Sequence, residues 1–321
     1  MTTPSARATE ITGRLAPSPT GHLHLGHARS FLLAWWHARA RGGRIVLRIE
    51  DLDTERVKPG MIEATLADLR WLGLDWDGEP HVQSAGEARI AAAAAALVAR
   101  GLAYPCTCTR AEIAAAASAP HVGESGPRYP GTCRGRWPSV ESAQSATGRA
   151  PALRFVVREG PIEIEDGLHG RLAFDVARAA GDFPIYRRAG SPAYQLAVVV
   201  DDAWQAVTEV VRGEDLLESA ARQALLQEAL GLPRPRWWHV PLVTDEHGRR
   251  LAKRSDDLSL ASLRERGVDP RAVVGWVARR SGLKSARDAW PAGLVREFAL
   301  DRIPRTPVAA GPLEIAELAA G

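Results

Sequence analysis

The stretch PSPTGHLHLGHARS (residues 17–30) holds three histidines within six positions, framed by prolines and glycines. The segment before it, residues 11–17 (ITGRLAP), has the composition of a short strand that ends at a proline. After it, residues 27–43 show helical spacing up to a pair of glycines, and residues 44–51 (RIVLRIED) indicate a buried strand. Strand, turn, helix and strand in this order predict a βαβ unit and therefore an α/β fold with a parallel sheet.

The histidine-rich turn has three interpretations. His24 and His27 could hold a metal, but helical zinc sites usually space histidines four apart beside a carboxylate, and no acidic residue lies between residues 12 and 48. The histidines could also be incidental. A nucleotide-binding turn fits best, because Gly21 and Gly26 allow close backbone approach, and a helix N-terminus with imidazole donors favours phosphate.

A second basic element lies far down the chain, in TDEHGRRLAKRSDD (residues 244–257). Its Lys253 is one of only three lysines among the 41 basic residues. The plain structural interpretation is a solvated run of charge. Two basic segments on either side of a nucleotide would, however, be suited to stabilise a phosphate group during transfer.

The bulk composition is that of a globular protein. Hydrophobic residues make up 45% of the 321 residues and charged residues 25%, which predicts packed cores in about two domains. The sequence has no apolar run of about 18 residues and no secretory pattern at its N-terminus, so we expect a cytoplasmic protein that spans no membrane. A net charge of +3 is compatible with an anionic partner.

The remaining segments predict a mixture of helices, strands and one insertion. Periodicity and composition indicate helices at 61–77 and 87–102, an insertion rich in Cys, Pro, Gly and Ser at 103–150, a β-hairpin at 152–166, buried strand character at 183–204, a strand running into a helix at 207–230, and several helices within 231–321.

All three cysteines, Cys106, Cys108 and Cys133, lie in the insertion. An odd count in a cytoplasmic chain argues against disulfides and favours a metal site or plain thiols. Structural zinc takes four ligands, so one ligand is missing from the cysteine set. On chemistry alone His121 is the fourth ligand, which would make a Cys₃His site.

Several separated segments resemble class I aminoacyl-tRNA synthetases. HLGH (24–27) resembles the HIGH signature, and RLAKR (250–254) resembles the KMSKS loop, although Ala252 and Arg254 stand where that signature has serines. The stretches RLAPSPTG, LRIEDLDTER, YQLAVVVDD and VVRGEDLLES are similar to the glutamyl branch. The resemblance implies a Rossmann-like doubly wound parallel sheet with an inserted zinc-bearing subdomain and a C-terminal helical region that contacts the tRNA stem. The implied segments are 1–102 and 184–232 for the two halves of the catalytic domain, 103–183 for the insertion, and 233–321 for the KMSKS-like loop and helical region.

The resemblance also implies substrates and site residues. The substrates are L-glutamate and ATP with Mg²⁺, and one structural Zn²⁺ is expected. The implied glutamate-binding residues are Arg14, Leu15, Ala16, Pro17, Ser18, Glu50, Tyr194 and Arg212. The implied ATP-binding residues are Pro17, Gly21, His24, Gly26, His27, Arg250, Lys253 and Arg254, of which His24, His27 and Lys253 are catalytic. The implied zinc ligands are Cys106, Cys108, Tyr129 and Cys133, so Tyr129 is the family's alternative to His121.

The length of the chain bears on which RNA accepts the glutamate. By the same resemblance, full glutamyl-tRNA synthetases continue into a large helical anticodon-binding region, for which the residues after Asp257 leave too little chain. We therefore expect a monomeric, shorter type that transfers glutamate to queuosine in the anticodon loop of tRNA(Asp). The alternatives are a truncated enzyme that charges tRNA(Glu) and a catalytically idle RNA-binding paralogue. A nucleotidyltransferase with a small-molecule acceptor is disfavoured by the glutamyl-type motifs.

Overall fold

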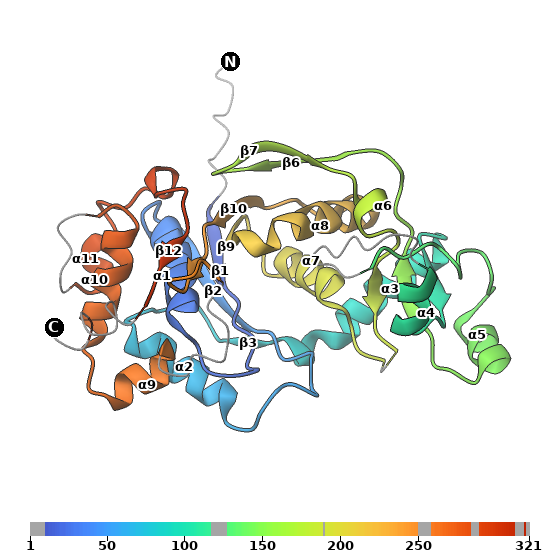
Figure 1. The fold of residues 1–321 in the computed structure, drawn as a ribbon, viewed down its shortest axis with the longest axis horizontal. Coiled ribbons are helices and arrows are strands. Elements are labelled where there is room, and N and C mark those ends of the chain that lie inside the picture. Colours follow the sequence, from blue (N-terminus) through green and yellow to red (C-terminus); the bar gives the residue numbers. More distant parts are fainter. Residues whose placement is uncertain are drawn as a thin grey trace, which may run out of the picture. The chain divides into compact units, whose positions relative to one another are not determined.

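The computed structural model of this chain describes residues 10–116, 127–188, 190–249, 258–283, 289–311 and 318. The chain forms two compact units, each built from separated segments, and Figure 1 labels their helices and strands. The first unit comprises Met1–Val82, Ala206–Asp215 and Pro235–Gly321, and the second comprises Gln83–Gln205 and Leu216–Arg234.

The first unit contains the predicted βαβ start. Its main strands are β1 (Thr12–Leu15), β2 (Arg44–Ile49), β3 (His81–Val82), β9 (Glu209–Gly213) and β10 (Arg236–Val240). Strand β2 lies between β1 and β3 and is parallel to both, and β9 and β10 form another parallel pair. The backbone N–H of Thr208 donates to the carbonyl of Thr12 at 2.9 Å, which joins the start of β9 to β1. The prediction of an α/β fold with parallel strands is confirmed.

Helix α1 (Leu25–Arg39) packs on β1, β2 and β9, as Figure 1 shows. The helix is largely buried, and its Trp36 is fully enclosed. Gly13 of β1 permits this close packing, because a Cβ atom there would lie only 3.1 Å from the Cβ of Ala38. Since α1 begins shortly after β1 ends, its N-terminus lies at the edge where the parallel strands end, the usual ligand edge of open α/β sheets.

The rest of the first unit is mostly helical. Its other elements are the parallel strands β11 (Val243–Thr244) and β12 (Val308–Ala309), the helices α2 (Met61–Trp71), α9 (Leu260–Glu265), α10 (Pro270–Arg280) and α11 (Pro291–Leu294), and the short 3₁₀ helix η4 (Leu300–Arg302). Helix α2 ends at Trp71, earlier than the expected residue 77, because Gly73 takes a left-handed φ of 74° that a helix cannot continue through.

The second unit contains an antiparallel sheet, a hairpin and several helices. Its strands are β4 (Ala103–Cys106), β5 (Ala152–Phe155), β6 (Ile162–Asp166), β7 (Gly170–Phe174) and β8 (Pro184–Tyr186). Its helices are α3 (Glu87–Ala99), α4 (Arg110–Ala116), α5 (Val140–Thr147), α6 (Val176–Ala179), α7 (Tyr194–Trp204) and α8 (Leu217–Leu230), with the 3₁₀ helix η1 (Gln83–Gly86); η2 (Glu214–Leu216) joins β9 to α8.

The predicted hairpin at residues 152–166 is wrong. Strand β5 pairs instead with β4 and β8, and β6 forms a hairpin with β7, which follows it directly. Asp166 makes the tight connection, since its carboxylate accepts the backbone N–H groups of Leu168 and His169 at 2.9 Å. The two predicted strands exist, but each has another partner.

The predicted strand character of residues 183–204 is correct only at its start. Strand β8 forms there, but the valine-rich segment that follows is the helix α7. This helix packs against both α3 and α8 and buries seven consecutive residues, 196–202. A helix enclosed on several sides has no polar stripe, so its sequence resembles a buried strand. The predicted strand and helix at 207–230 are confirmed as β9 and α8.

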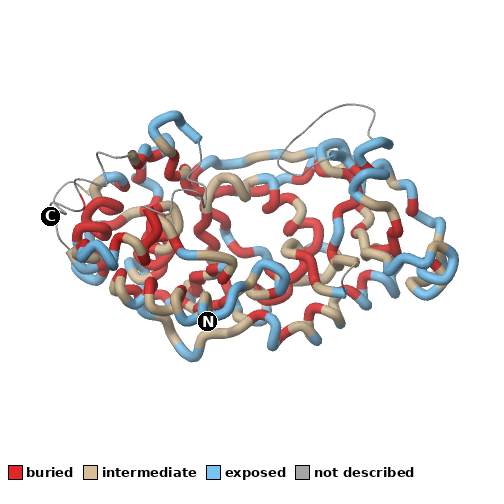
Figure 2. The backbone as a smooth tube through the Cα atoms, turned by 60° about the horizontal axis from the view of Figure 1, so that its bottom comes forward, coloured by how far each residue is buried: buried red, intermediate tan, exposed pale blue. Residues whose placement is uncertain are grey.

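Burial follows the packed elements in each unit. Figure 2 shows buried residues in red, and those of the first unit include the apolar side chains of β1, β2 and α1. In the part of the chain that the structure describes, no helix has both the length and the apolar character needed to cross a lipid bilayer.

Candidate active site and metal centre

The two outer histidines of HLGH cap the start of helix α1, because each imidazole accepts a backbone N–H group of this turn. The backbone N–H of Gly26 donates to Nδ1 of His24 at 3.1 Å, and the backbone N–H of His24 donates to Nδ1 of His27 at 3.2 Å. The two rings lie with their centroids 3.8 Å apart. Because Nδ1 is an acceptor in both rings, the proton of each neutral imidazole is on Nε2. The HLGH turn therefore combines a helix N-terminus with two imidazoles of defined tautomer.

Space at this turn is restricted by the same histidine. A Cβ atom on Gly26 would lie 3.0 Å from Cε1 of His24, so a larger residue would displace the capping ring. The preceding loop is fixed to the sheet, because the backbone N–H of Glu50 donates to the carbonyl of Pro17 at 2.9 Å. The predicted nucleotide turn and the end of β2 are thus directly connected, with Gly21 in the loop between Pro17 and α1.

The predicted glutamate residues of the first unit lie on or directly after its parallel strands. Arg14 and Leu15 end β1, Ala16–Ser18 follow them, and Glu50 follows β2. The fully buried guanidinium of Arg48 donates to the Glu50 carboxylate at 3.1 and 3.3 Å. This pairing holds the Glu50 carboxylate at the strand ends, with one of its oxygens bound to the positive charge of Arg48.

Arg212 lies on β9 and faces His239 on the neighbouring strand β10. The two residues are register partners, both are buried, and Nε of Arg212 donates to Nε2 of His239 at 3.0 Å. The contact orients the guanidinium plane. Tyr194, the remaining predicted glutamate residue, is the first residue of α7 in the second unit.

The KMSKS-like segment 250–254, with Arg250, Lys253 and Arg254, lies outside the described residues. Residues close to that segment on both sides contact the HLGH turn. Val243 of β11 is 3.7 Å from where a Cβ atom of Gly26 would be. Ser259 forms an antiparallel bridge with His24, and the backbone N–H of Leu260 donates to the carbonyl of Leu23 at 2.8 Å.

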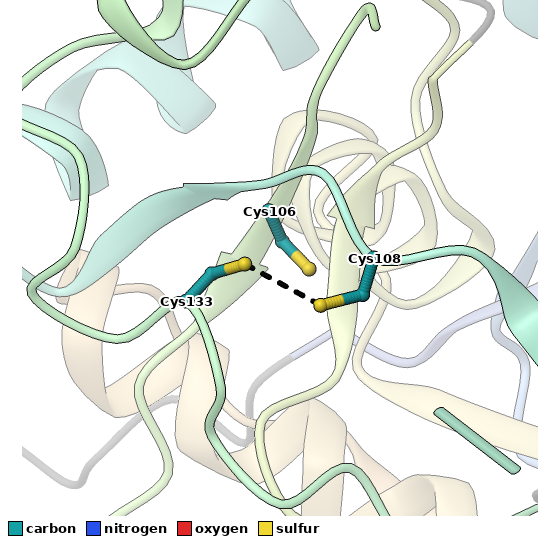
Figure 3. Close-up of side chains that lie close together, drawn as sticks. All are labelled: Cys106, Cys108 and Cys133. Carbon is teal, nitrogen blue, oxygen red and sulfur yellow. Dashed lines mark hydrogen bonds between the residues drawn. The ribbon is translucent and has the colours of Figure 1, made fainter. Parts of the chain in front are cut away.

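The three cysteines converge in the second unit. Their sulfur atoms lie within 4.8 Å of one another, and Figure 3 shows them pointing toward a common centre. Sγ of Cys108 is 3.4 Å from Sγ of Cys133. The hydroxyl of Tyr129 lies 3.3 Å from Sγ of Cys106 and 3.9 Å from Sγ of Cys108. A tetrahedral zinc ion with bonds of about 2.0–2.3 Å separates its ligand atoms by about 3.5–3.8 Å. The three cysteines, with the Tyr129 hydroxyl beside them, are therefore compatible with a zinc site.

The surroundings of this cluster favour a thiolate at one cysteine. Burial opposes ionisation of Cys133, but the backbone N–H of Thr107 and hydrogen bonds from Cys108 and Tyr129 outweigh it and lower the pKa of Cys133 to about 7. Arg154 donates through Nε to Sγ of Cys106 at 3.3 Å, and its guanidinium lies 3.9 Å from the centre of the Tyr129 ring. This positive charge suits a cluster of metal-bound thiolates. The rival ligand, His121, lies outside the described residues.

Comparison with known proteins agrees with this geometry. Residues 10–289 match the family model described as tRNA synthetases class I (E and Q), catalytic domain. A protein of Symbiobacterium thermophilum named glutamyl-Q tRNA(Asp) synthetase is 48% identical, with the match covering 97% of this chain and 99% of that protein. The chain belongs to the glutamyl-Q tRNA(Asp) synthetase family of class I tRNA synthetases.

Further relatives differ in how much of their length is matched. A glutamyl-Q tRNA(Asp) synthetase of Rhodopirellula baltica is 47% identical, and the match covers 90% of this chain and 89% of that protein. The crystal structure of a glutamate-tRNA synthetase from Elizabethkingia anophelis has a TM-score of 0.81 at 26% identity, covering 95% of this chain but 69% of that chain. The chain thus matches the glutamyl-Q tRNA(Asp) synthetases over nearly their full length.

Within this glutamyl-Q tRNA(Asp) synthetase family member, three contacting residues were not found from the sequence. Arg48 and His239 sit in apolar strand segments and orient Glu50 and Arg212, and Arg154 contacts the cysteine cluster. A charged residue or a histidine inside a buried strand was the available signal, because buried polar side chains require partners.

Proposed function

We propose that this chain activates L-glutamate with ATP and transfers it to queuosine in the anticodon loop of tRNA(Asp). The observation that carries the first step is the mutual capping of α1 by His24 and His27 at the ends of the parallel strands. The near full-length relationship to proteins named glutamyl-Q tRNA(Asp) synthetase supports the acceptor.

In the first step, an oxygen of the α-carboxylate of glutamate attacks the α-phosphorus of ATP. The bond from that phosphorus to the bridging oxygen breaks, which yields glutamyl-adenylate and pyrophosphate. Nε2–H groups of His24 and His27 and the N-terminus of α1 stabilise the charge on the phosphate oxygens. Lys253 neutralises the departing pyrophosphate, and Mg²⁺ bound with ATP would supply further positive charge.

Glutamate is held through its α-ammonium group and one of its carboxylates. The Glu50 carboxylate pairs with the α-ammonium, and the guanidinium of Arg212, oriented by His239, pairs with a carboxylate. Segment 14–18 lines the pocket in the first unit, and the resemblance to the family adds Tyr194 to the glutamate-binding residues. The Arg48 contact keeps one side of the Glu50 carboxylate occupied, so the other side is directed to the substrate.

In the second step, a hydroxyl group of queuosine attacks the carbonyl carbon of the adenylate. The bond to the phosphate oxygen breaks, AMP departs, and the hydroxyl proton passes to solvent. Cys106, Cys108, Tyr129 and Cys133 would hold zinc in a structural role, because four protein ligands would leave no open position for a substrate.

The test measures transfer of radiolabelled glutamate, with ATP, to three RNAs: tRNA(Asp) with queuosine, the same tRNA without it, and tRNA(Glu). Label on the queuosine-bearing tRNA(Asp) alone is the expected result. Label on tRNA(Glu) would identify a charging enzyme instead. Absence of glutamate-dependent pyrophosphate exchange would identify an idle RNA-binding paralogue.

A further inference from the structure

A buried arginine lies two residues after the HLGH motif. Arg29 of α1 is 1% exposed, and its NH1 group donates to the carbonyl of Pro241 at 2.5 Å. Its Nε and NH2 atoms are buried and make no hydrogen bond within the part of the chain that is described. Burial lowers the pKa of Arg29 to about 10, against the opposing attraction of the Glu214 carboxylate. A charged group is therefore held in the protein interior with incomplete hydrogen bonding.

The partners of Arg29 come from segments next to the candidate site. Glu214 follows Arg212 by two residues, and Pro241 follows His239 by two residues. The backbone N–H of Leu242 donates to the Glu214 carboxylate at 3.3 Å. The buried Arg29, the peptide after Pro241 and the half-buried Glu214 thus form one polar cluster, which we call the Arg29 cluster.

The Arg29 cluster connects three parts of the site. Helix α1 carries His27 and is capped by His24, and β9 and β10 carry Arg212 and His239. The chain after Leu242 enters β11, the strand that precedes the KMSKS-like segment. An apolar side chain of similar size would avoid the desolvation of a buried charge, and such replacements are often neutral or stabilising in other proteins. The arginine is therefore a poor choice for stability alone.

We propose that Arg29 is a positioning residue, which fixes the Pro241–Leu242 peptide against α1 and so sets the Arg212–His239 pair and the start of β11 relative to the HLGH histidines. The expected kinetic effect of this inference rests on the proposed function, whereas the expected structural effect does not. A misplacement of about 1 Å can lower a chemical rate by about a hundredfold, so kcat is expected to change more than KM.

The test compares Arg29→Met with Arg29→Lys and with Arg39→Met. Arg39 is a matched control, because it lies on the same helix but forms ion pairs with Asp75 and Asp77 at the opposite end. We expect Arg29→Met to lower kcat for glutamate-dependent pyrophosphate exchange by about 10–100-fold while its melting temperature is unchanged or higher. Arg29→Lys should recover part of kcat, and Arg39→Met should lower the melting temperature with normal kcat.

A readout without substrate separates this inference from the proposed function. Hydrogen exchange of the Leu242 and Val243 amides should accelerate in Arg29→Met, while exchange in the middle of α1 stays as in the wild type. Unchanged exchange at Leu242 and Val243 would overturn the inference, even if the wild-type chain shows no glutamate-dependent activity. A loss of kcat that only follows a loss of folded protein would overturn it as well.

Discussion

Arg212 and His239 are direct neighbours across two parallel strands, and Nε of the arginine donates to Nε2 of the histidine at 3.0 Å. His239 is fully buried and accepts through Nε2, so its own proton is on Nδ1. The pair gives a buried guanidinium a fixed plane, which is what bidentate binding of a carboxylate requires.

His239→Leu should therefore weaken glutamate binding. The substitution leaves Nε of Arg212 without this acceptor and is expected to lower the free energy of unfolding by about 1–3 kcal/mol. KM for glutamate in pyrophosphate exchange should rise more than KM for ATP. His239→Gln, which offers an amide oxygen, is the control and should recover part of both losses. Equal KM values for His239→Leu and wild type would exclude this role for the pair.

His24→Asn should separate the structural and chemical roles of the first HLGH histidine. Asparagine is among the best N-cap residues, so the free energy of unfolding should be retained or increased. The substitution removes the Nε2–H donor, and kcat for adenylate formation should fall by about 10²–10³-fold, as when one oxyanion donor is removed. His22→Asn changes an exposed histidine of the same turn and should leave kcat unchanged. Equal losses in both variants would contradict the assignment.

Lys253→Ala should reduce glutamate-dependent pyrophosphate exchange by about 10²–10³-fold while the melting temperature stays the same. The reason is loss of the positive charge that meets the departing pyrophosphate. Lys58→Ala is the control, since Lys58 is an exposed lysine in another part of the chain. Near-normal exchange in Lys253→Ala would remove this residue from the mechanism.

The cysteine cluster should bind about one zinc ion per chain. Chelation should lower the melting temperature, because metal binding is coupled to folding. Tyr129→Phe should weaken zinc binding at least about tenfold, judged from losses at supporting residues of metal sites, whereas His121→Ala should leave it unchanged. Zinc titration of both variants would show the reverse pattern if His121 were the fourth ligand.

Acid should destabilise the first unit through His37. Burial lowers the pKa of His37 below its ordinary value of 6.5, despite its contact with Glu209 at 3.0 Å, and Arg41 and Arg236 also face the ring. The unfolded chain then binds this proton more readily than the folded protein, so stability is lost as the pH falls below about 6.5. Urea unfolding at about pH 7.5 and about pH 5.5 should show a smaller loss for His37→Phe than for wild type.

Local patterns in the sequence were sufficient for the βαβ core. Strand, glycine-rich turn and helix follow one another within residues 11–51, so their contacts are short-range and their order defines the sheet direction. The sequence of the valine-rich helix α7 predicts a strand, because seven consecutive residues, 196–202, are buried where the helix packs against α3 and α8. The predicted hairpin is wrong, because strand pairing depends on which partner strand lies beside each strand in the folded chain.

The sequence indicates which residues belong to the candidate site, but it does not indicate the contacts that orient them. The sequence indicated Glu50 and Arg212 by resemblance, but Arg48 and His239, which orient them, act through pairings that no local motif specifies. Tyr129 was likewise named by resemblance, whereas ligand chemistry favoured His121. The hydroxyl of Tyr129 lies 3.3 Å from Sγ of Cys106 because the segments carrying them, 23 residues apart, fold together.

The mutual cap of His24 and His27 limits the chemistry that these rings can perform. With Nδ1 of each ring accepting a backbone N–H group, neither can take up a proton there without releasing the first turn of α1. Neither ring can therefore act as a general base through Nδ1. The proposed first step needs no general base, since the carboxylate nucleophile is already ionised. Folding of the helix selects the donor tautomer before any nucleotide arrives.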